Sequence, residues 1–225
     1  MLHKIQGIVL NYIRYKETSI ILKIFTDNFG LQSYIVNSIR TNRGSSKIAL
    51  FQPMTILDLV VYRNDQKSIQ RISESRCHII YHSIPFNIKK SSVAIFWSEI
   101  LSKTLTSEGL EDRRKFKFVR EKLIELDETK DGIENYPITF TFQLAELLGF
   151  AISSSRDLVR TYSEAINSTQ EELIDYFESL STAQPLENNI SQRKLALDCL
   201  ISYYQDHFDG FGSLKSAVVL RQVFL

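Results

Sequence analysis

The sequence contains few cysteines, prolines and glycines. Of its 225 residues only Cys77 and Cys199 are cysteine, four are proline and eight are glycine. Two cysteines so far apart cannot by themselves form a metal cluster or a disulfide framework, which favours a protein of the reducing cytosol. The longest apolar runs fall well short of the roughly 20 residues that cross a bilayer. We therefore expect no membrane span and a cytoplasmic location.

Signatures of catalysis are also absent. The sequence has no GxxxxGK phosphate-binding loop, so any dependence on ATP must come from partners. None of the four histidines is spaced from a serine or cysteine as in a nucleophile and its base. A carboxylate cluster at residues 171–175 is best interpreted as the solvated first turn of a helix. These absences predict a protein that is not an enzyme and that uses no cofactor.

Charge is distributed unevenly along the chain. Residues 1–84 contain eleven Lys or Arg against five Asp or Glu, a net charge of +6, and the rest of the chain carries −5. A basic half on an almost neutral chain indicates an anionic partner for that half, although basicity for solubility alone is an alternative. The clearest basic segment is "NSIRTNRGSSKI" at residues 37–48, which has three cations and no acid. It is long and glycine-containing, as suits a loop that follows a phosphate backbone, and a disordered, solvated loop is the alternative.

The first 84 residues alternate apolar and polar side chains with a period of two. Five such runs occur, at residues 7–15, 18–25, 31–36, 55–62 and 68–80, separated by turn-forming residues. Five short strands with one long connection predict a small antiparallel barrel of the five-stranded oligonucleotide-binding (OB) type.

From Pro85 the apolar spacing becomes helical. Six helices are predicted, at about 93–109, 116–126, 136–149, 168–180, 191–210 and 213–224. The expected fold is therefore an α+β multidomain chain. Residues 1–84 form an OB-fold nucleic-acid-binding domain, and residues 85–225 form an all-α helical domain that binds partners.

Several short motifs, taken in order, resemble the RecO family of bacterial recombination mediators. In "FTDNFGLQSYIVNSIRTNRGSSKIALFQPMTILDLVVY" a T-x-x-x-G turn precedes a strand, a basic loop with a serine, and a proline before the next strand. The matching residues are Thr26, Gly30, Arg43, Ser46, Leu50, Pro53 and Met54. Residues 17–19 are similar to the family's opening turn, and "LGF" at 148–150 and "SLKSAVVLRQVF" at 213–224 resemble its helical core and last helix. The resemblance covers nearly the whole chain.

The resemblance implies a DNA repair and homologous-recombination function. RecO-like proteins bind single- and double-stranded DNA, anneal complementary strands and, with RecR, help load RecA onto strands coated by single-stranded-DNA-binding protein (SSB). They also grip the acidic, apolar C-terminal tail of SSB. Many members carry four cysteines for a zinc site after the "LG-F/Y" helix, but residues 151–170 here contain none. We therefore expect no metal.

The candidate DNA-binding residues are cations and aromatics of the barrel. They are Arg14, Lys16, Lys23, Arg40, Arg43 and Lys47 for phosphates, and Tyr12 and Tyr34 for base stacking. For both tyrosines, ordinary cross-strand packing is an equal alternative.

The candidate SSB-tail residues are the cations of the helical half, because the tail needs a cation beside an apolar groove. They are Arg113, Arg114, Lys117 and Arg120 before and within one helix, and Lys215 and Arg221 in the last helix. A solvated helix face is the alternative for the first set. The rival function is an OB-fold protein-interaction adaptor without functional DNA binding, which DNA affinity at physiological salt would distinguish.

Overall fold

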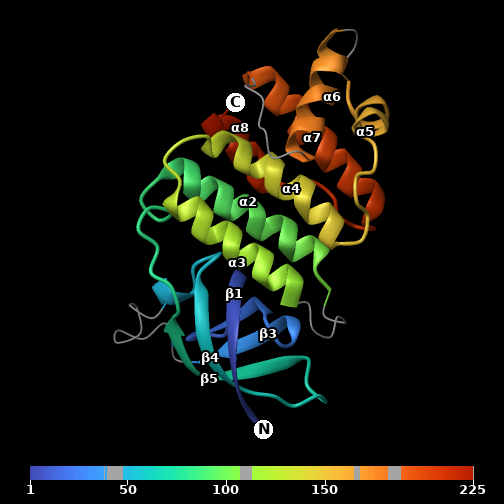
Figure 1. Ribbon diagram of the computed structural model, residues 1–225. Coiled ribbons are helices and arrows are strands. Elements are labelled where there is room, and N and C mark those ends of the chain that lie inside the picture. Colours follow the sequence, from blue (N-terminus) through green and yellow to red (C-terminus); the bar gives the residue numbers. More distant parts are fainter. Residues whose placement is uncertain (38, 40–47, 107–112, 165–167, 182–188, 225) are drawn as a thin grey trace. The chain divides into compact units, whose positions relative to one another are not determined.

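The first part of the chain is a closed barrel of five strands (Figure 1). The structure is a computed structural model that describes residues 1–37, 39, 48–106, 113–164, 168–181 and 189–224. The strands are β1 (Leu2–Tyr15), β2 (Ser19–Thr26), β3 (Gly30–Val36), β4 (Ile56–Tyr62) and β5 (Ile69–Cys77). They follow one another around the barrel in the order β1-β2-β3-β5-β4. The prediction of an OB-type barrel followed by an all-α part is confirmed.

The barrel is not wholly antiparallel. Strands β3 and β5 run parallel, with Ser33 opposite Ile69 and Ile35 opposite Arg71, whereas the other neighbouring strands are antiparallel. The sequence pattern had predicted an antiparallel barrel, and for this pair the prediction was wrong. Alternation shows which residues share a face, but it carries no information on the direction of the neighbouring strand.

Alternate residues of all five strands fill the barrel interior. The buried cluster includes Ile5, Val9, Ile20, Leu22, Ile24, Tyr34, Leu57, Leu59, Val61 and Ile72. Gly7 lies in the same inward-facing series of β1. A Cβ atom on Gly7 would lie 2.5 Å from Cγ2 of Ile24 and 3.0 Å from Cδ1 of Leu59. Position 7 therefore favours glycine, because β2 and β4 approach the backbone too closely there for a larger side chain.

One outer face of the barrel is covered by helical residues of the same compact unit, which comprises residues 1–85 and 98–128. Helix α2 (Ile88–Thr104) contributes its second half, and α3 (Arg113–Glu128) lies wholly in this unit. The register shifts between Val9 and Asn11. Beside this shift, the amide of Asn11 donates a hydrogen bond to the Oγ of Ser102 at 3.2 Å. The ring of Phe25 packs on that of Phe116 with centroids 5.7 Å apart.

A single carboxylate fixes the chain that leaves β5. The backbone N–H groups of His82, Ser83 and Ile84 donate to Asp127 at 2.8, 2.9 and 2.8 Å. Burial acts to raise the pKa of Asp127, but these hydrogen bonds outweigh burial and hold its pKa below the ordinary value. The charged carboxylate thus ties the end of the barrel to α3.

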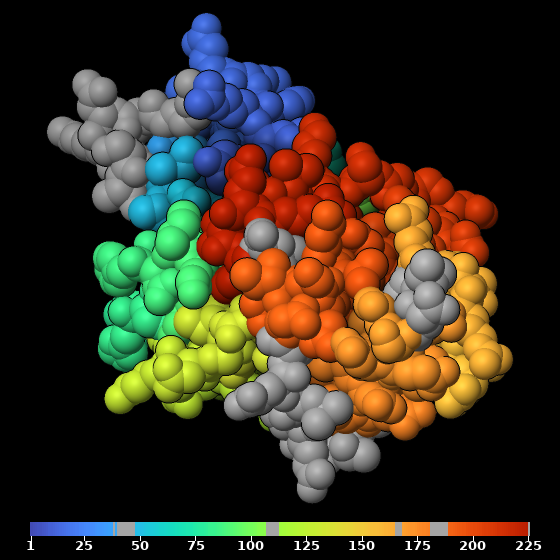
Figure 2. All heavy atoms as spheres, turned by 90° about the horizontal axis from the view of Figure 1, so that it is seen from above, coloured from blue at the N-terminus to red at the C-terminus, as the bar shows by residue number. Residues whose placement is uncertain are grey.

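The second compact unit comprises residues 86–97 and 129–225 and is helical. Its helices are the first half of α2, α4 (Tyr136–Leu147), α5 (Ser155–Tyr162), α6 (Ser168–Ser181), α7 (Ile190–His207) and α8 (Lys215–Phe224). In the view of Figure 2 the atoms of α6, α7 and α8 gather into one continuous surface. Trp97, the only tryptophan, is fully buried and stacks on Phe140 with centroids 4.3 Å apart. Helix α2 contributes residues to both compact units. The division into a DNA-binding part ending at residue 84 and a partner-binding part beginning at residue 85 concerns function and stays a prediction.

Helix α5 was not predicted from the sequence. It is only eight residues long, and it buries just Leu158 and Val159. Its start is fixed by Ser154, whose Oγ accepts a hydrogen bond from the backbone N–H of Asp157 at 3.1 Å. Such a short apolar face gives no clear periodicity.

Candidate nucleic-acid interface

One end of the barrel joins the β1–β2 turn to the start of the basic segment. The turn consists of residues 16–18, between β1 and β2. The backbone N–H of Ile39 donates to the carbonyl of Thr18 at 2.9 Å. Next to it, the hydroxyl of Ser19 donates to Oδ1 of Asn37 at 3.0 Å. We call this region, made of residues 14–19, 37 and 39, the turn end.

Two predicted DNA-contacting cations lie at the turn end. Arg14 is exposed and stands opposite Ile20 in the last rows of the β1–β2 pairing. Lys16 is exposed, has φ of 52°, and places its Nζ 5.4 Å from the centroid of the Tyr15 ring. A left-handed φ is costly for a residue other than glycine and is held here by the turn. The resulting surface presents two cations and one aromatic ring.

Three further predicted residues, Arg40, Arg43 and Lys47, lie outside the described part of the chain. The residues on either side of them are described. Ile39 is buried and hydrogen-bonded to the turn, and Ile48 precedes a short 3₁₀ turn at Ala49–Phe51. The described contact of the basic segment with the turn is therefore the one made by Ile39.

Lys23 points to a different face of the β1–β2 pair from Arg14. Lys23 stands opposite Asn11, whereas Arg14 belongs to the alternate series with Tyr12. Successive side chains of a strand point to opposite faces, so the two cations cannot contact the same short stretch of phosphate backbone. The sequence prediction had grouped them because it could not supply the register.

Of the two tyrosines predicted for base stacking, Tyr34 belongs to the barrel core and Tyr12 packs against it. Tyr34 is only 1% exposed, and burial raises its pKa well above the ordinary value. Tyr12 is partly buried against the same interior cluster. The ring of Tyr34 therefore has no open face for a base, and the packing alternative fits it; Tyr12 packs on the core but keeps part of its surface exposed. The aromatic ring that is exposed at the turn end is Tyr15, at 38%.

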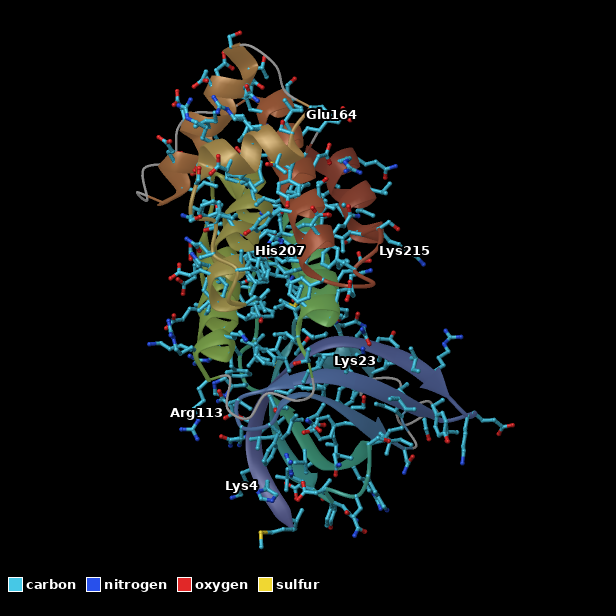
Figure 3. The ribbon with its side chains drawn as sticks, turned by 90° about the vertical axis from the view of Figure 1, so that its right-hand side faces the viewer. Lys4, Lys23, Arg113, Glu164, His207 and Lys215 are labelled. Carbon is cyan, nitrogen blue, oxygen red and sulfur yellow. The ribbon has the colours of Figure 1, made fainter. Side chains whose placement is uncertain are left out.

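A hollow on another side of the barrel is unsuited to phosphate. It holds about 550 Å³ and is lined by residues of β1, β4 and β5 and of the β2–β3 turn. Its charged residues are Asp27, Asp58, Glu74, Lys4 and Arg76. Burial acts to raise the pKa of Asp58, but hydrogen bonds from His78 and Arg76 outweigh burial and lower it. Three carboxylates against two cations would repel a phosphate backbone. Figure 3 shows Lys4 and Lys23 on different sides of the barrel.

The cations of α3 line a helix whose apolar stripe is turned inward. Phe116, Val119 and Leu123 are buried. Arg113 donates to Oδ1 of Asn28 at 3.3 Å, and Nζ of Lys117 lies 3.7 Å from Glu121. The α3 set of Arg113, Arg114, Lys117 and Arg120 therefore offers charge beside a buried apolar stripe.

Helix α8 combines a cation with exposed apolar side chains. Val218 is 53% exposed and Val219 is 42% exposed, one turn along the helix from Lys215. Lys215 lies at the surface of its unit (Figure 3). Arg221 forms an ion pair with Asp198 of α7.

On the other side of α8 a narrow groove contains Arg193, a cation that the sequence prediction did not include. Its apolar walls include Leu197, Leu220 and Phe224. The groove encloses only about 10 Å³, which is barely room for one water molecule. This volume is too small for a peptide side chain, so the exposed face of α8 is the better surface for a peptide.

Neither a metal site nor a membrane helix is found in the described part of the chain. No three of its His, Cys, Asp and Glu side chains are placed to hold an ion. Among the same residues, no helix has both the length and the apolar character of a membrane span.

These features define a protein class: an OB-type barrel with a basic turn end, joined to a helical part. A family described as "Recombination protein O N terminal" matches residues 1–81. "DNA repair protein RecO" of Flavobacterium psychrophilum is 32% identical over 236 residues and covers 98% of each chain. Proteins of the same name from Bacteroides fragilis and Azobacteroides pseudotrichonymphae are 28% and 27% identical, over the full length of each chain. The chain belongs to the RecO family, which consists of non-enzymatic recombination mediators, and membership confirms that it is not an enzyme.

Proposed function

We propose that this chain is a mediator of recombinational DNA repair. In this role it binds single- and double-stranded DNA, anneals complementary strands and, with RecR, helps load RecA onto SSB-coated single strands. Full-length relatives named DNA repair protein RecO support the role. The observation that carries the DNA-binding part is the hydrogen bond from Ile39 to Thr18, because it brings the start of the basic segment next to Lys16.

The turn end binds the DNA backbone in this proposal. Arg14 and Lys16 neutralise phosphates, and Arg40, Arg43 and Lys47 extend the same basic region along the chain. Tyr15 supplies the one exposed ring at this end for stacking on a base. Phosphate contacts carry no sequence information, so binding should tolerate any base sequence, as annealing requires.

The SSB tail binds the exposed face of α8 in this proposal. Val218 and Val219 receive its apolar side chains, and Lys215 receives its terminal carboxylate. The cations of α3 lie beside an inward-facing apolar stripe and serve the tail less well.

The direct experiment is a titration of the full chain against fluorescent single-stranded oligonucleotide at physiological salt, with and without SSB. We expect binding that is weakened several-fold by Arg14→Ala with Lys16→Asn and unchanged by Lys4→Ala with Lys67→Ala. The control pair removes the same charge from exposed positions away from the turn end. Loss of all DNA binding at physiological salt in the unmodified chain would instead favour the adaptor function.

A further inference from the structure

The outer face of β1, β2 and β3 carries a row of isoleucines. Ile13 stands opposite Ile21, and Ile21 stands opposite Ile35 on the next strand. Ile13 is 61% exposed, and the other two are partly exposed. We call these three residues the isoleucine row. Neighbouring strands are about 4.8 Å apart, so the row spans roughly 10 Å. That length fits one strand or one helix face of a partner.

Two cations flank the row. Arg71 of β5 stands opposite Ile35, and Lys23 lies in the adjacent outward-facing position of β2. Both side chains are exposed, and neither has an ion-pair partner among the described residues. Ile69 of β5, 39% exposed, extends the apolar surface beside Arg71. Strands β1, β2 and β3 contain no acidic residue.

The chemistry of this face does not suit nucleic acid. Isoleucine has no π-face on which a base could stack and no group that hydrogen-bonds a base edge or phosphate. Arg14, a cation suited to DNA at the turn end, lies in the alternate side-chain series of β1, and of the turn-end residues of β1 only Tyr15 shares the series of Ile13.

A second copy of the chain is also a poor occupant. Two such faces packed together would bring Lys23 and Arg71 of both copies close to one another with no carboxylate from β1, β2 or β3 between them. Like charges at close range oppose association, whereas charge complementarity favours a partner that carries carboxylates. The apolar row requires that the same partner also present aliphatic side chains.

We propose that the isoleucine row, with Lys23 and Arg71, is a docking surface for an acidic protein segment with alternating apolar and carboxylate side chains. The segment lays its apolar side chains on Ile13, Ile21 and Ile35 and pairs its carboxylates with the two cations.

The test uses a fluorescein-labelled twelve-residue peptide of alternating Glu and Leu as the probe, with a Lys and Leu peptide of the same length as its control. Fluorescence anisotropy with the full chain should show binding of the Glu-Leu probe only. Lys23→Glu with Arg71→Glu should weaken it at least tenfold. Ile13→Ser, at the most exposed position of the row, should weaken it several-fold. The matched pair Lys4→Glu with Lys67→Glu should change affinity less than twofold, and affinity for single-stranded DNA should persist in Ile13→Ser.

Several results would overturn the proposal. Absence of probe binding, or equal loss in both charge-reversed pairs, would show that no acidic segment is recognised here. A fall in DNA affinity for Ile13→Ser would assign the face to nucleic acid. Self-association of the chain that Ile13→Ser abolishes, measured by sedimentation, would assign it to a second copy. The reversed charges are exposed, so the folded barrel should persist in each variant, and circular dichroism checks this.

Discussion

The backbone N–H of Ile39 donates to the carbonyl of Thr18 at 2.9 Å and so joins the end of β3 to the β1–β2 turn. The two residues belong to different connections of the barrel. Thr18 lies in the turn between β1 and β2, and Ile39 lies near the start of the basic segment between β3 and β4. Their hydrogen bond places Lys16 next to the residues that lead into Arg40 and Arg43. In the proposed DNA interface, this hydrogen bond is the described contact that links the β1–β2 turn to the start of the basic segment.

A substitution at Lys16 can remove the positive charge without adding backbone strain. Its φ of 52° costs about 1 kcal/mol for most side chains, but asparagine tolerates this region well. We expect Lys16→Asn to leave the melting temperature unchanged or slightly higher, while affinity for single-stranded DNA falls. Lys67→Asn, in the β4–β5 turn, is the control and should leave DNA affinity unchanged. A Lys16→Asn chain with full DNA affinity would remove Lys16 from the interface.

The carboxylate of Asp127 should make the free energy of unfolding depend on pH in the acid range. Its folded-state pKa lies below the ordinary value, so its contribution is complete above the unfolded pKa of about 3.9 and is lost as the pH falls through the folded pKa. Asp127→Asn, which keeps the shape but removes the charge, should lower the free energy of unfolding by roughly 1–3 kcal/mol at neutral pH. The difference between the two proteins should shrink below pH 4 in denaturant titrations. A difference that stays constant down to pH 2 would contradict the role of the charge.

The strands of the barrel were largely predictable from the sequence, whereas the face on which each cation or aromatic side chain lies was not. Alternation identified the five strands, since inward positions such as Leu22 and Leu59 must be apolar. The same pattern could not tell whether Tyr34 faces a base or the core, because a tyrosine suits both. Register was also inaccessible: it depends on the irregularity between Val9 and Asn11, and it alone separates Lys23 from Arg14.

The two candidate tail sites can be distinguished by matched variants. We expect Lys215→Glu with Val218→Ser to reduce affinity for a peptide of the SSB tail at least tenfold, because it removes the cation and part of the apolar contact. Arg113→Glu with Arg114→Glu should change affinity less than threefold. Fluorescence anisotropy of the labelled peptide measures both. The opposite ranking would move the tail to α3.

The stretch that holds zinc cysteines in many relatives is expected to be stable without metal. Here the hydroxyl of Tyr203 donates to the carbonyl of Phe150 at 2.9 Å, and the buried side chains of Leu158 and Val159 anchor α5. With no cysteine between residues 78 and 198, purified protein should contain no stoichiometric zinc by elemental analysis. Chelators should leave its melting temperature unchanged. One zinc per chain would contradict this expectation.

The most direct test of the central claim is the salt dependence of DNA binding by the triple variant Arg40→Ala, Arg43→Ala and Lys47→Ala. Each phosphate contact to a single strand contributes about 0.7 to the logarithmic salt slope, so the slope should flatten by roughly 2. Affinity should fall equally for all base sequences, annealing should weaken in parallel, and binding of the SSB-tail peptide should not change. The control triple of Lys4→Ala, Lys67→Ala and Lys130→Ala should keep the original slope. An unaltered slope in the Arg40, Arg43 and Lys47 variant would show that the basic segment does not contact DNA.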